Sequence, residues 1–321
     1  MEHVLLFNIS NVLVRITADN PVIFDIVKVF FSGYSFKHYY NDKKSVVTIN
    51  IYSSKKSPIS HIKETTTLFK YGRIKGYRLD ANTLMFCDNT TFVFVKENIS
   101  VADVYMDMSI LNRGTEFVSI FLTLALIELL RYKGLYYLHA SALKKGNHAI
   151  LLCGMGMSGK TTLSLGLVSK GYLLCSDDAV FLKQRVNRVQ AIGFKKDIHV
   201  TKQTLKIYSH MFEDIKPPVP PVRKAFIPYK RFQTVSSVIP DILIFLQRVD
   251  SSTTHISPIE KTKAMSLLIP QSLMVFFKKE IANKHIDILK ALIYQAKPYL
   301  CLCGKDILKN PLIILKEISN T

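Results

Sequence analysis

The chain has 321 residues, of which 48% are hydrophobic and 21% are charged, and its formal net charge is +19 at pH 7. This length suits two domains, and this composition excludes an acidic disordered chain. The lysines and arginines are dispersed rather than gathered into a basic arm, which favours an anion-binding cleft over a nucleic-acid-binding protein.

The sequence also predicts the compartment. The five cysteines are odd in number and lack zinc spacing, which indicates reduced thiols. The start, MEHVLLFNISN, has no basic segment and predicts no signal peptide. The longest apolar stretch, Phe117 to Leu130, contains Glu128 and is too short to span a bilayer. We therefore expect a cytoplasmic protein with no membrane partner.

Residues 1–112 have mostly strand-like composition, as in SVVTINIYSS and in LMFCDNTTFVFVKE with a hairpin turn at Asp88 and Asn89. One stretch, PVIFDIVKVFFSGY, has helical spacing of its apolar residues. No cluster of catalytic residue types stands out here. We expect an N-terminal α+β domain that serves recognition or packing.

Residues 113–134 predict one helix, TEFVSIFLTLALIELLR, with basic residues near its end and Gly134 beyond it. Phe117, Phe121, Leu124 and Glu128 share one face of this helix. We expect it to link the two halves of the chain.

Residues 135–321 read as a catalytic domain with C-terminal helices. LYYLHASALKKGNHAILLCG predicts two strands, and a helix is expected from Lys160 to about Lys170, before Gly171. YLLCSDDAVFL is an apolar strand broken by two carboxylates, and KPPVPPVRKAFIPYKRF predicts an extended loop. DILIFLQRV and YLCLCG predict strands, while the segment from Ser257 and KHIDILKALIYQA predict helices. The expected fold class is α/β with a mixed sheet.

The segment GMGMSGKTT carries the strongest motif of the chain. Its spacing, Gly154-x4-Gly159-Lys160-Thr161, is that of a phosphate-binding loop. Backbone N–H groups and the following helix N-terminus face phosphate, Lys160 reaches the outer phosphates, and Thr161 offers a hydroxyl to Mg²⁺. The alternative is a glycine-rich turn. The candidate nucleotide-binding residues are Gly154, Met155, Gly156, Met157, Ser158, Gly159, Lys160, Thr161 and Thr162.

The carboxylates of Asp177 and Asp178 are candidates for chemistry. Neighbouring residues of a straight strand face opposite sides, so both serve one site only if the chain bends there. One would hold Mg²⁺ and the other would accept the proton of an attacking hydroxyl. The alternative is two solvated aspartates at a strand end. His139, which follows the strand LYYL, is either a third member of this site or a packed histidine.

LYYLHASAL and GMGMSGKTTLSLGLVSKGYLLCSDDAVFL, together with their spacing, resemble the catalytic domain of HPr kinase/phosphorylase and its relatives. The resemblance covers residues 135–182, and more loosely extends to about residue 250. It implies the fold of phosphoenolpyruvate carboxykinase-like kinases and transfer of the γ-phosphate of ATP to a serine hydroxyl.

By position, the resemblance implies that Asp177 is the base, with His139 beside it. Asp178 would be a second acid near metal and substrate, so the expected Mg²⁺ ligands are Thr161 and Asp178. The stretch AIGFKKDIHV contains Asp197 but lacks the glutamate of the bacterial enzymes, which argues against the reverse, phosphorylase reaction. The order of the chain's parts is more similar to HPr-kinase-like proteins of peptide natural-product clusters, including kinases of lasso-peptide precursors.

The sequence therefore predicts an ATP- and Mg²⁺-dependent kinase that acts on a serine of a peptide or small protein. The alternatives are a small-molecule kinase, acting for instance on free serine, and a catalytically silent nucleotide sensor. Oligomeric state stays open. In VRKAFIPYKR, Arg223 is the candidate for a cation that acts on the transferring phosphate, and the alternative is a basic surface loop.

Overall fold

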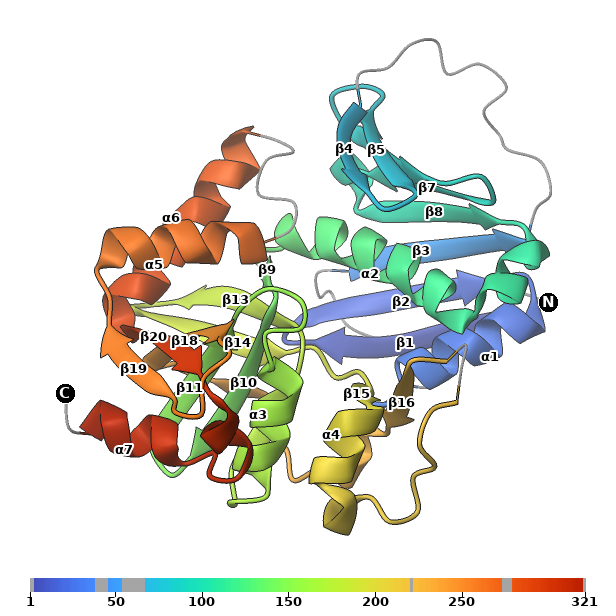
Figure 1. The fold of residues 1–321 in the computed structure, drawn as a ribbon. Coiled ribbons are helices and arrows are strands. Elements are labelled where there is room, and N and C mark those ends of the chain that lie inside the picture. The colour runs from blue at the N-terminus through green and yellow to red at the C-terminus, as the bar shows by residue number, and fades with distance from the viewer. Residues whose placement is uncertain (1–2, 38–45, 54–66, 220–221, 273–278, 320–321) are drawn as a thin grey trace. The chain divides into compact units, whose positions relative to one another are not determined.

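A computed structural model describes residues 3–37, 46–53, 67–219, 222–272 and 279–319. The chain forms two compact units, Met1–Leu135 and Tyr136–Thr321. Both combine helices with β-sheets, so the predicted α/β class is confirmed (Figure 1). Among the described residues, no helix has the length and apolar character needed to cross a membrane.

Unit 1 is built on one mixed sheet, which has eight strands within the described residues. The strand β3 pairs in parallel with β2 and β8, and the other neighbours pair antiparallel. The order across the sheet is β1 (His3–Ile9), β2 (Val12–Ala18), β3 (Val46–Ser53), β8 (Val101–Met106), β7 (Thr91–Lys96), β6 (Thr83–Cys87), β5 (Ile74–Arg78) and β4 (Thr67–Tyr71).

Two α-helices of unit 1 accompany this sheet. Helix α1 (Pro21–Phe30) begins where the side chain of Asn20 accepts the N–H groups of Val22 and Ile23. Helix α2 (Thr115–Arg131) packs on β3, β7 and β8. The segment predicted as a link is thus part of unit 1.

Unit 2 contains three sheets within the described residues, and the largest is mixed. Its strand order is β12 (Leu173–Ser176), β10 (Ala140–Lys145), β11 (His148–Cys153), β18 (Ile242–Arg248), β20 (Lys297–Cys303) and β19 (His255–Pro258). The second sheet runs β17 (Ser237–Val238), β14 (Arg188–Gly193), β13 (Val180–Arg185) and β9 (Tyr136–Leu138). The third pairs β15 (Ile198–Thr201) with β16 (Lys224–Ile227).

Helices cover both faces of the large sheet of unit 2. Alternate residues of β11 point to opposite faces, and both faces are buried. Leu151 packs with α5 (Lys261–Leu268), α6 (Lys279–Gln295) and the sheet that contains β13. Leu152 packs with α3 (Lys160–Val168) and α7 (Ile313–Ser319). The remaining helix, α4 (Lys202–Ile207), packs beside α3 in a third cluster.

Three local predictions need correction. YLLCSDDAVFL forms two strands in different sheets, β12 and β13. Part of the predicted extended loop is strand β16, because Lys224–Ile227 pairs with β15; prolines 220 and 221 lie outside the described residues. His255–Pro258, where we expected a helix to begin, is strand β19 because it pairs with β20. The expected helix then follows as α5, and the last residue of that predicted stretch, 273, lies outside the described residues.

Candidate functional site

The phosphate-binding motif occupies the turn between strand β11 and helix α3, as expected from the sequence. At Gly154 a Cβ atom would lie 2.9 Å from the carbonyl oxygen of Leu246, so a side chain does not fit. Gly159 has φ +100, which favours glycine, and the helix begins at the next residue. Met157 has φ +67 although it is not glycine, so the loop holds one strained residue.

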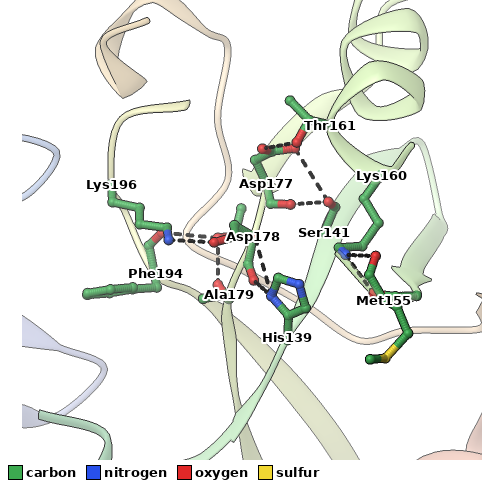
Figure 2. Close-up of polar contacts among 12 residues, drawn as sticks. His139, Ser141, Met155, Lys160, Thr161, Asp177, Asp178, Ala179, Phe194 and Lys196 are labelled. Atoms are coloured by element: carbon green, nitrogen blue, oxygen red, sulfur yellow. Dashed lines mark hydrogen bonds and ion pairs between the residues drawn. The ribbon is translucent and has the colours of Figure 1, made fainter. Parts of the chain in front are cut away.

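Lys160 is folded over this loop. Its Nζ donates to the carbonyl oxygens of Gly154 at 2.6 Å and Met155 at 3.2 Å (Figure 2). The residue is only 6% exposed, and burial lowers the pKa of its ammonium. A bound anion would offer a charged partner in place of these neutral carbonyls.

The site lies where two chain segments cross between sheets. His139 follows β9 and precedes β10, so the chain passes there from the four-stranded sheet to the six-stranded sheet. The segment from Asp177 to Ala179 makes the reverse passage from β12 to β13. Because β9 pairs with β13 and β10 pairs with β12, the two crossings lie side by side. The break at the aspartates is where the chain passes from one sheet to the other, beside His139.

Asp177 faces the phosphate-binding loop. Its Oδ2 accepts a hydrogen bond of 2.8 Å from the hydroxyl of Thr161, and its backbone carbonyl accepts one from Ser141 (Figure 2). Asp177 is buried. Burial, reinforced by the charge of Asp178, raises the pKa of this carboxyl to about 6.

Asp178 faces away from the loop hydroxyl and towards two bases. Its Oδ2 lies 2.6 Å from Nζ of Lys196, and its Oδ1 lies 3.2 Å from Nδ1 of His139 (Figure 2). The side chain is 42% exposed. Burial alone would raise the pKa of Asp178, but Lys196 and His139 outweigh it and hold that pKa well below its usual range. This carboxylate is therefore ionised at neutral pH.

The structure places the remaining predicted residues as follows. Burial lowers the pKa of His139, whose Nδ1 also lies 2.8 Å from the backbone oxygen of Asp178. Asp197 accepts the backbone N–H of Tyr229, which ties β15 to the segment after β16. Arg223 is exposed, and among the described residues its side chain has no hydrogen bond or ion pair.

Sequence reasoning missed several neighbours of the site. Lys196 comes from the segment after β14, where Phe194 donates its N–H to Ala179. Burial, together with the charges of Lys196 and Lys224, lowers the pKa of His199 to about 4. The side-chain amide of Gln271 donates to the sulfur of Met155 at 3.2 Å. The backbone carbonyl of Gln271 accepts the backbone N–H of His139 at 2.8 Å. Lys196 and His199 lie in the stretch AIGFKKDIHV, but nothing in its local pattern shows that strand pairing brings these residues to the aspartates.

The residues present fit a nucleoside triphosphate and Mg²⁺. The buried hydroxyl of Ser158 in the loop has no hydrogen-bond partner within the described part of the chain, and a phosphate oxygen would supply one. Thr161 and Asp177 offer adjacent hard oxygens, as Mg²⁺ prefers. No group of three or more His, Cys, Asp or Glu side chains suited to a metal occurs among the described residues.

Fold and site together define a mixed α/β protein with a phosphate-binding loop beside a carboxylate pair. No protein-family model matches the chain. No curated protein matches it either. Among solved structures, an HPr(Ser) kinase/phosphatase from Coxiella burnetii matches with 16% identity and a TM-score of 0.31. The match covers 57% of this chain and 94% of that chain. At this level the similarity carries no argument about the reaction, so the function is argued from the site.

The ion pair between Asp178 and Lys196 leads to a testable prediction about the pKa of Asp178. In Lys196→Gln the pKa of Asp178 is expected to rise by about one to three pH units, because an opposite charge at 2.6 Å is lost. Titration of the Asp178 carboxyl carbon by NMR measures this. Lys195→Gln is the control, since it removes an equal charge one residue earlier. An unchanged Asp178 titration in Lys196→Gln would contradict the pairing.

Proposed function

We propose that unit 2 is an ATP- and Mg²⁺-dependent kinase that transfers the γ-phosphate to a serine hydroxyl of a peptide or small protein. One observation supports this above all others: Asp177 contacts the loop hydroxyl of Thr161, while Asp178, the next residue, faces outwards at the same site. A loop that only bound phosphate would not require the second, accessible carboxylate.

In this proposal the loop holds the triphosphate. Backbone N–H groups of the loop and the N-terminus of α3 face the phosphate oxygens, and Lys160 moves from the loop carbonyls onto the outer phosphates. Thr161 and Asp177 hold Mg²⁺, which when bound neutralises charge on the transferring phosphate. The charges of Lys196 and Lys160 add a positive field around the carboxylates.

The contacts favour an exchange of the roles that the resemblance implies for the aspartates. Asp177 is buried against the metal-binding hydroxyl, whereas Asp178 is accessible and ionised. We therefore assign metal binding to Asp177 and acceptance of the serine proton to Asp178. Because its low pKa makes Asp178 a weak base, it acts mainly by orienting the hydroxyl and accepts the proton late in a loose transition state. The serine hydroxyl loses its proton to Asp178 as its oxygen bonds to the γ-phosphorus, the bond from that phosphorus to the bridging oxygen breaks, and ADP leaves. His139 and Lys196 orient the Asp178 carboxylate.

Exposure at the site favours a macromolecular acceptor over a small molecule. Met155 and Met157 in the loop are 64% and 91% exposed, and the side chain of Asp178 is 42% exposed. A serine on a peptide surface can approach such a group directly. The finer proposal, that the acceptor is the precursor of a ribosomal peptide natural product, rests on the sequence resemblance alone.

The function is tested with γ-³²P-labelled ATP, Mg²⁺, an array of serine peptides, and free L-serine. Label on serine peptides, absent from the same peptides with alanine, is the expected result. Label on free serine alone would favour the small-molecule kinase. ATP binding by calorimetry without transfer to any acceptor would favour the sensor.

Arg223 remains our candidate for a cation that acts on the transferring phosphate. Arg223→Ala is then expected to lower kcat more than it raises KM for ATP, because an interaction made only in the transition state appears in kcat. Lys224→Ala is the matched comparison, since the charge of Lys224 lowers the pKa of both Lys160 and His199. If only Lys224→Ala lowers kcat, the prediction for Arg223 is wrong. A change in the acceptor KM alone would instead make this segment a docking surface.

A further inference from the structure

A basic cavity lies at the other end of helix α3 from the phosphate-binding loop. Its volume is about 840 Å³, and its walls come from the end of α3, from α4 and the turn after it, from the end of β18, and from the 3₁₀ turn Lys305–Leu308 with the residues that follow. Helix α3 spans about 13 Å between the loop and this end. The cavity is therefore distinct from the candidate kinase site.

The cavity concentrates positive charge that the protein does not neutralise. Lys170, Arg248, Lys305 and Lys309 line it, and no acidic residue does. Among the described residues, Lys170, Arg248 and Lys309 have no carboxylate partner. Only Lys305 has one, Asp250 at 3.1 Å, and both of those side chains are largely exposed. Cations that converge without counter-charges repel one another, and an anion between them relieves that repulsion.

The other lining residues indicate the size and kind of the anion. Ile207, Leu308 and Pro311 give the cavity an apolar part, while Ser169 and Gln203 add hydrogen-bonding groups. The volume falls in the range of small-molecule sites. The hydroxyl of Tyr208, also a lining residue, is buried with no hydrogen-bond partner in the described part of the chain. That oxygen lies beneath the wall, beside Gly166, rather than at its surface.

We propose that this cavity binds a small oligoanion that carries several phosphate groups. A guanidinium and three ammonium groups suit multiple phosphate oxygens, and a volume of about 840 Å³ suits a small molecule. The ligand can be an inorganic oligophosphate or a phosphorylated metabolite, since both present the same charged oxygens. This inference does not depend on the proposed kinase activity.

The test uses inorganic tripolyphosphate as the probe, measured by isothermal titration calorimetry. Lys160→Ala serves as the background, because it weakens binding of the same probe at the phosphate-binding loop. In this background the cavity site is expected to remain. Adding Arg248→Gln and Lys309→Gln is expected to raise the tripolyphosphate Kd by about tenfold or more for each charge removed.

The control replaces two exposed lysines of helices α5 and α6, Lys263→Gln and Lys284→Gln, and so removes the same total charge. It is expected to leave the Kd within about twofold, apart from the general effect of net charge. All replaced side chains are exposed, and thermal unfolding checks that each variant is folded. Equal weakening by both pairs would overturn the proposal, as would retention of binding in Arg248→Gln/Lys309→Gln. Tighter binding of poly-L-glutamate than of tripolyphosphate would also overturn it, in favour of an acidic polypeptide.

To separate the two ligand sources, adenosine tetraphosphate and fully inorganic tetraphosphate are compared in the same background. Equal affinity indicates that phosphate alone is recognised. Tighter binding of the adenosine compound indicates that the apolar part of the cavity, with Ile207 and Leu308, contributes. Either result supports the site, because both ligands need the same cations. If neither ligand binds, the proposal is overturned.

Discussion

Lys160→Ala is expected to lower phosphoryl transfer by about 10²-fold or more and to weaken ATP binding, because Lys160 carries the only charge between Gly154 and Thr162. The ammonium of Lys160 already contacts the loop, because its Nζ lies 2.6 Å from the backbone carbonyl oxygen of Gly154. The measurements are kcat with saturating acceptor and the Kd for ATP by calorimetry.

The matched control is Lys263→Ala, which removes a lysine from the exposed face of helix α5. It is expected to leave both constants unchanged. If Lys160→Ala keeps turnover near that of the wild type, the loop is not the catalytic one and the proposed function is wrong.

The neighbouring aspartates give the second large effect. Asp178→Asn is expected to keep the affinity for ATP and Mg²⁺ but to lower transfer by about 10²-fold or more, because it preserves shape and removes the proton acceptor. Asp177→Asn is expected to raise the Mg²⁺ concentration needed for half-maximal rate, because it removes an oxygen ligand beside Thr161. Rates are measured across a Mg²⁺ series for both variants.

The reverse outcome would restore the order that the sequence resemblance implies. In that case Asp177→Asn would lose transfer with unchanged Mg²⁺ dependence, and Asp178→Asn would shift the Mg²⁺ dependence. Because the two residues are adjacent and the charge of Asp178 adds to the effect of burial on the pKa of Asp177, both variants are compared within one experiment.

The pH dependence of Mg²⁺ binding is an independent test of the roles assigned to Asp177 and Asp178. The pKa of Asp177 is raised to about 6, so its carboxyl is increasingly protonated as pH falls below that value. A protonated carboxyl is a poor ligand, and Mg²⁺ affinity is therefore expected to fall below about pH 6 in the wild type. In Asp177→Asn this dependence should disappear. In Asp178→Asn it should remain but move to lower pH, because the charge of Asp178 no longer raises the pKa of Asp177.

The local parts of the site could be predicted from the sequence because they are encoded by neighbouring residues. The loop spacing from Gly154 to Thr161, the strand before it and the helix after it are all short-range features. The break at Asp177 and Asp178 was also visible as two charges inside an apolar run. The requirement for a bend there followed from strand geometry, and the structure meets it by dividing the run between two sheets.

The sequence could not predict what depends on strand pairing across the fold. Lys196 lies 2.6 Å from Asp178 because the segment after β14 runs beside the crossing at Ala179. The contact with Lys196 is one reason why we assign Asp178, and not Asp177, as the proton acceptor. The proline-rich flanks of strand β16 predict a loop, because they dominate the local pattern. Pairing with β15 supplies the hydrogen bonds that make this segment a strand.

The central claim is that this protein moves a phosphate onto a serine, and one experiment tests it most directly. Wild-type protein and Asp178→Asn are incubated with Mg²⁺ and γ-³²P-labelled ATP on an array of peptides, each with one serine or with alanine in its place. We expect wild-type protein to label serine peptides, the alanine peptides to stay unlabelled, and Asp178→Asn to label about 10²-fold less. Binding of ATP to the wild type with no labelled peptide, or equal labelling by Asp178→Asn, would contradict the account.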